Sequence, residues 1–268
     1  MPDANRDSSA ITSYFDGLSD LLSQLSGSQE NAMREASELM ANTIQRGSVV
    51  HLFGSGHSML PVLELFPRYG SFVGLNPLTD PRLFWFNVLG TFGVSEMLFL
   101  QNTEGYADVF LEGQELKAGD AMIVFSHSGN NAVVVDAARY AQRHDIAVIA
   151  VSSGNAQQAQ PRHSSGQKLS DIATVVIDTG APRGEALLQM DGVPEPVGAV
   201  TTLLAMAAGL GLVCGTTEIL QSRGHELVYS TRAESNEGSS YQNVYQAHRA
   251  AVRREGTHST DAVALTRD

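Results

Sequence analysis

Apolar residues recur at helical spacing in two segments near the start of the chain, 10–26 and 31–46. This spacing predicts two amphipathic helices. A short apolar run at 48–53 follows, runs directly into a loop at 54–58, and precedes a helix expected over 59–66. The beginning of the chain therefore predicts two helices and then a strand, loop and helix unit.

Strand and helix patterns alternate further along the chain. The expected strands are apolar at every position, which is typical of strands buried on both faces of a parallel sheet. The sequence predicts an α/β fold in which helices cover both faces of the sheet, a three-layer α/β/α sandwich. The expected strands are 96–101, 121–125, 146–151 and 173–177, and the expected helices are 132–143 and a long one from about 197.

One domain is expected over residues 10–250, with flexible tails at 1–9 and 251–268. The segment 154–166 is rich in Gln, Ser and Gly and is predicted to be a mobile loop that carries no core packing. The chain has 268 residues, 43% of them hydrophobic, which is enough material for one large core.

Charge and cysteine content narrow the class of partner. The net charge of -12 repels nucleic acid and anionic lipid, so a bound phosphate must be held by local contacts. Cys214 is the only cysteine, which excludes an intramolecular disulfide and multi-cysteine zinc sites. No signal sequence is recognisable, and the apolar stretch 197–214 is interrupted by Gly and Thr, so a cytoplasmic protein with no membrane or nucleic acid partner is expected.

The main candidate for chemistry is the loop Ser126-His127-Ser128-Gly129-Asn130-Asn131, between a predicted strand and a predicted helix. Ligands of open α/β sheets bind outside the carboxyl ends of the strands, where helix N-termini offer free N–H groups to anions. The serine hydroxyls add neutral donors, and a phosphate is the expected ligand. The alternative is that Ser128 or Asn130 only caps the helix.

A second loop, Gly54-Ser55-Gly56-His57-Ser58, has the same strand-to-helix context. It is neither a dinucleotide fingerprint, because Met59 stands where a third glycine is needed, nor a Walker A loop, because no lysine follows. By itself it could be a tight turn. Two such loops at separate strand ends favour a shared small ligand.

Both loops, together with Glu195-Pro196-Val197-Gly198, resemble the sugar isomerase (SIS) domain over about residues 31–224. The resemblance implies a flavodoxin-like sheet of five parallel strands, a homodimer or homotetramer, and a sugar phosphate held by the serine loops. The segment after residue 227 is more loosely similar to an uncharacterised SIS subfamily that resembles phosphoheptose isomerase. The expected phosphate-binding residues are Gly54, Ser55, Gly56, Ser58, Ser126, Ser128, Asn130 and Asn131.

Isomerisation of a sugar phosphate needs a group that removes a proton beside the carbonyl. By resemblance to the glucosamine-phosphate branch of the family, Glu195 is the expected base, with Glu64 as second choice. His57 could protonate a ring oxygen, whereas His127 is expected to point away from the ligand. An acidic residue in the first helical turn is the alternative explanation for Glu195. No cofactor and no metal are expected.

Three functions agree with these residues. The expected one is an aldose–ketose sugar-phosphate isomerase of carbohydrate metabolism. A phosphosugar lyase or deaminase would use the same enolisation chemistry. A sensor that binds a sugar phosphate without turnover is the third, although the chain has no basic helix-turn-helix pattern for DNA contact.

Overall fold

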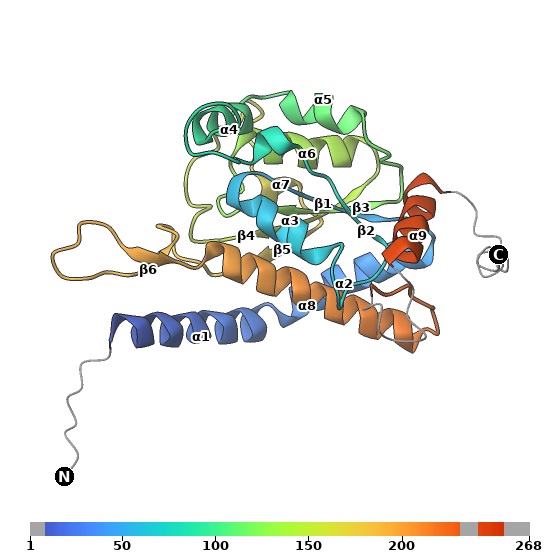
Figure 1. Ribbon diagram of the computed structural model, residues 1–268, viewed down its shortest axis with the longest axis horizontal. Coiled ribbons are helices and arrows are strands. Elements are labelled where there is room, and N and C mark those ends of the chain that lie inside the picture. The colour runs from blue at the N-terminus through green and yellow to red at the C-terminus, as the bar shows by residue number, and fades with distance from the viewer. Residues whose placement is uncertain (1–8, 231–240, 255–268) are drawn as a thin grey trace, which may run out of the picture.

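A five-stranded sheet lies at the centre of the computed structural model, which describes residues 9–230 and 241–254 (Figure 1). All neighbouring strands are parallel, in the order β2-β1-β3-β4-β5. This is the flavodoxin-like order, as predicted from the resemblance. The strands are β1 (Val50–Gly54), β2 (Leu75–Pro77), β3 (Ala121–Phe125), β4 (Ala147–Ser152) and β5 (Val175–Asp178).

Helices cover both faces of the sheet and complete the predicted three layers (Figure 1). One face is covered by α2 (Glu30–Gln45), α3 (Met59–Leu65) and α8 (Thr201–Ser222). The other is covered by α4 (Val94–Gln101), α5 (Tyr106–Glu112), α6 (Ala132–Arg143) and α7 (Leu169–Ile172). Two short 3-10 turns, η1 (Gly56–Ser58) and η2 (Pro81–Leu83), follow β1 and β2, and α9 (Tyr241–Arg253) ends the described chain.

Burial explains why the two central strands are apolar throughout. Every residue of β1 and β3 is buried, and the rings of Phe53 and Phe125 are fully inaccessible. Helix α6 packs against β1, β3 and β4 and also against α4, α5 and α7, and its consecutive residues 132–138 are all buried. The central strands thus have no solvent-facing side that would call for alternating polar residues.

Two elements extend from this compact body on the same side (Figure 1). They are α1 (Ala10–Ser28) and the antiparallel hairpin of β6 (Ala186–Leu188) and β7 (Val197–Ala199). The Tyr14 hydroxyl donates a hydrogen bond to the Ala199 carbonyl at 2.9 Å, which joins the helix to the hairpin. This arm lies beside α8, which runs back into the body.

Helix α8 is long and apolar enough to cross a membrane, with a mean hydropathy of 1.7 over its most apolar window. In the structure it packs against α1, α2, α3 and β4. Its buried residues include Leu204, Ala208 and Leu212, as the sequence predicted for a core helix.

The prediction of a strand at 96–101 is wrong, because these residues belong to α4. Only Met97 and Gln101 of this helix are buried, and they are one helical turn apart. A short apolar run gives too few positions to separate a strand from a helix. The sequence also gave no sign of the edge strand β2 or of α5.

Two boundaries also differ from the predictions. The long helix begins at Thr201, because residues 197–199 form β7 of the hairpin. Residues 251–253, which were expected to lie in a flexible tail, belong to α9, and Arg254 pairs with Asp120. Residues 1–8, 231–240 and 255–268 lie outside the described chain.

Candidate functional site

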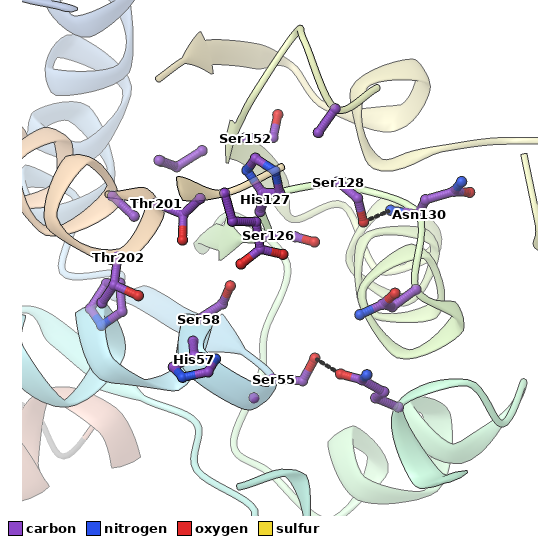
Figure 2. Close-up of a pocket in the computed structure, with 18 of the residues that line it drawn as sticks. Ser55, His57, Ser58, Ser126, His127, Ser128, Asn130, Ser152, Thr201 and Thr202 are labelled. Atoms are coloured by element: carbon purple, nitrogen blue, oxygen red, sulfur yellow. Dashed lines mark hydrogen bonds between the residues drawn. The ribbon is translucent and has the colours of Figure 1, made fainter. Parts of the chain in front are cut away.

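A cavity of about 600 Å³ opens at the carboxyl edge of the sheet (Figure 2). Four adjacent strands, β1, β3, β4 and β5, each contribute one polar residue to its lining, at or just after the end of the strand. These residues are Ser55, Ser126, Ser152 and Thr179. This volume lies in the usual range for small-molecule sites. Both serine loops therefore meet at one cavity, where open α/β sheets bind their ligands.

The 126–131 loop joins β3 to α6 and is folded by two of its own serine hydroxyls. Ser126 Oγ accepts a hydrogen bond from the Gly129 N–H at 3.1 Å, and Ser128 Oγ accepts one from the Asn130 N–H at 3.3 Å. The residue that precedes α6 is Asn131, and its side chain makes no capping hydrogen bond. Ser128 and Asn130 therefore do not cap α6. The first N–H groups of α6 form no hydrogen bond with a side chain of the described residues.

The 54–58 loop turns sharply behind β1. A Cβ atom at Gly54 would lie 2.2 Å from the backbone oxygen of Ser58, so only glycine permits this turn. Ser55 Oγ donates to Gln101 Oε1 of α4 at 3.4 Å, and the His57 ring meets the Trp85 ring edge-on at 4.5 Å. Gly54 shapes the loop from the end of the strand, whereas Ser55, Gly56, His57 and Ser58 line the cavity.

Asn130 lines the cavity, and its side chain also contacts the backbone of a neighbouring loop. Its Nδ2 donates to the Gln160 carbonyl at 2.9 Å, and its Oδ1 accepts from the Arg162 N–H at 2.9 Å. The side chain thus fixes the backbone at 160–162 and brings Arg162 to the cavity.

The loop 154–166 is therefore not free of the body, contrary to the prediction. Its His163 is buried, and the ring nitrogen Nε2 lies 2.8 Å from Asp136 Oδ1 on α6. The Ser164 N–H donates to Glu104 Oε1 at 2.7 Å. Composition alone suggested a mobile segment because these anchoring partners are distant in the sequence.

The charged lining differs in sign from the chain as a whole. Arg162, Arg183 and Glu185 line the cavity, so its lining includes two basic residues and one acidic residue in a protein of net charge -12. Such local positive charge favours an anionic ligand. Sequence patterns did not single out these three residues, nor the lining residues Gln101, Thr201 and Thr202.

Neither glutamate that was predicted to act as base lines the cavity. Glu64 pairs with Arg68 on the outer side of α3. Glu195 is exposed in the connection between β6 and β7, because the hairpin separates it from α8. Of the three predicted catalytic residues, the structure brings only His57 to the cavity.

His127 also lines the cavity, although it was expected to point away (Figure 2). Its Nε2 lies 3.5 Å from the Arg183 carbonyl oxygen. Its Nδ1 is buried with no hydrogen-bond partner in the described part of the chain.

Comparisons with known proteins agree with this arrangement. The SIS domain family matches residues 13–153. A UPF0309 protein of Halalkalibacterium halodurans is 33% identical over 81% of this chain and 85% of its own length. A UPF0309 protein of Streptomyces coelicolor is 32% identical over 80% of this chain and 84% of its own.

Among solved structures, the phosphoheptose isomerase of Neisseria gonorrhoeae superposes with a TM-score of 0.50 at 17% identity. The alignment covers 79% of this chain and 97% of that one, so the two share the fold. Sequence and fold thus lead to one conclusion: the chain belongs to the SIS domain family, alongside the UPF0309 proteins.

Proposed function

We propose that this protein binds a phosphorylated sugar in the cavity and interconverts its aldose and ketose forms. The observation that carries the proposal is the convergence of two serine loops, from β1 and β3, on one cavity at the carboxyl edge of the sheet. The phosphate would accept hydrogen bonds from Ser126 and Ser128 and from the N–H groups that begin α6. The Ser55 hydroxyl would join them by turning from Gln101 to the phosphate.

Family membership and fold support the same ligand class. The SIS domain is a sugar isomerase domain, and a solved structure of the same fold is a phosphoheptose isomerase. The cavity also has room for a sugar beside the phosphate, and its hydroxyl and amide groups suit polyol recognition. We further propose that the protein acts in the cytoplasm as a homo-oligomer.

Proton NMR of the protein with five-, six- and seven-carbon aldose phosphates tests this function. The expected result is the appearance of the matching ketose phosphate, with no loss of carbon or nitrogen from the sugar. Amino-substituted and lactyl-ether sugar phosphates are added to the panel, and release of ammonia or of a carboxylic acid from these would instead identify a deaminase or a lyase. Binding without any product would contradict an isomerase and favour a sensor.

A further inference from the structure

The cavity contains one carboxylate that the family resemblance did not indicate. Glu185 is the only Asp or Glu that lines the cavity in the described ranges 9–230 and 241–254. It lies between β5 and β6, where the chain leaves the sheet for the hairpin. Proton abstraction from carbon needs a base that can reach the bound ligand. Glu185 and Glu195 are both exposed, but only Glu185 lines the cavity.

The backbone of Glu185 is held in an unfavourable conformation. Its φ is +65°, in the left-handed region that residues with a Cβ rarely adopt. Its N–H donates to the Pro182 carbonyl at 2.9 Å, and its carbonyl accepts from the Val200 N–H at 3.0 Å. The loop after β5 and the start of α8 thus fix this residue from two sides.

Glycine would satisfy this backbone conformation better than glutamate. The other described non-glycine residues with positive φ are Phe92, Asp145 and Arg254, and none of them lines the cavity. Strained residues of this kind persist where surrounding structure imposes them, and they are frequent at functional sites.

The carboxylate itself has no structural partner. Within the described chain it forms no hydrogen bond and no ion pair, in contrast to Glu64 and its partner Arg68. Glu185 is exposed and lines the cavity, so its carboxylate is open to solvent and to a bound ligand.

We infer that Glu185 is the general base of the isomerisation, an inference that rests on the proposed function. In the open-chain aldose, the carboxylate takes the proton from C2, and the electron pair of that C–H bond forms the C1=C2 double bond. The C1 carbonyl oxygen takes up a proton from water, which gives an enediol. Glu185 then returns its proton to C1 while O2 loses one, which yields the ketose.

The variant Glu185→Gln tests this role, because it keeps the shape and removes the base. With the aldose phosphate that the wild-type protein converts, kcat should fall by about 10²–10⁴-fold while KM stays nearly unchanged. In D₂O, the wild-type protein should incorporate deuterium at C2 of the recovered aldose, and the variant should not. Glu195→Gln, which changes an exposed carboxylate outside the cavity, is the matched control and should keep wild-type turnover.

A second variant separates chemistry from folding. Glu185→Gly removes the carboxylate and relieves the positive φ, so its Tm should equal or exceed that of the wild-type protein while turnover is lost. Wild-type kcat in Glu185→Gln would overturn the role of Glu185 and leave the isomerase function standing. Absence of turnover by the wild-type protein across the panel would overturn both.

Discussion

Asp120 connects three distant parts of the chain through one buried carboxylate. Its Oδ2 lies 2.9 Å from His51 Nε2 on β1 and accepts a hydrogen bond from the Lys117 N–H at 2.9 Å. Its Oδ1 accepts from the Val49 N–H at 3.1 Å and pairs with Arg254 after α9. Burial alone would raise the pKa of Asp120, but the hydrogen bonds from His51 and the backbone outweigh it and lower the pKa below the ordinary 3.8.

Because the pKa of Asp120 is lower in the folded state than in the unfolded state, ionisation of Asp120 stabilises the fold at pH values above the unfolded pKa. This stabilisation is lost as the pH falls through the folded pKa. Replacement Asp120→Asn should therefore cost about 3–5 kcal/mol near neutral pH, because it leaves Arg254 without its buried partner. It should also flatten the loss of stability between about pH 5 and pH 2. Urea unfolding across this pH range measures both effects.

Asp108→Asn is the control for this prediction, since its pair with Arg143 is half exposed and should contribute at most about 1 kcal/mol. An Asp120→Asn protein with the wild-type dependence of stability on pH would contradict the account.

Site residues could be predicted from the sequence where neighbouring residues form a recognisable pattern. The serine loops combine small residues with a strand before and a helix after, and most of their residues do line the cavity. Glu185 has no such signal, because its position depends on the hairpin that brings Val200 back to its carbonyl. Glu195 is closer than Glu185 to α8 in the sequence, but it lies in the connection of the β6–β7 hairpin and is exposed outside the cavity.

At the scale of elements, the central strands and α6 were predictable because burial on every side leaves a continuous apolar pattern. Strands β6 and β7 are partly buried or exposed, and neither has an apolar run that distinguishes it from a loop. Residues 197–199 therefore read as the start of α8, with which they are contiguous.

Helices α1 and α8 retain apolar surface that the rest of the described chain does not cover. On α1, Ile11, Phe15 and Leu22 are exposed along one face, and on α8 Leu203 is 43% exposed. Sedimentation velocity at micromolar concentration should show an oligomer, and Phe15→Asp should shift it towards monomer. Ser23→Asp adds the same charge on another face of α1 and should not. A wild-type protein that sediments only as monomer would refute the proposed assembly.

The whole molecule combines a strongly negative surface with a cavity that suits an anion. The net charge of -12 works against binding any phosphate, whereas Arg162, Arg183 and the start of α6 attract one at a single place. If the proposed ligand binds here, this contrast would favour a small phosphorylated molecule over nucleic acid. The fold places both serine loops at that point by ending β1 and β3, which are neighbours in the sheet, at the same edge.

Thermal unfolding with and without sugar phosphates is the most direct test of this account, with Ser126→Ala/Ser128→Ala beside the wild-type protein. A sugar phosphate at 100 times its dissociation constant should stabilise the wild-type protein by about 2.7 kcal/mol. At the same concentration the double variant should gain much less, since each hydrogen bond to a charged phosphate contributes about 1.5–3 kcal/mol. Ser23→Ala/Ser28→Ala on α1 should respond as the wild-type protein does. Equal stabilisation of wild-type protein and the Ser126→Ala/Ser128→Ala variant, or none by any sugar phosphate, would contradict the account.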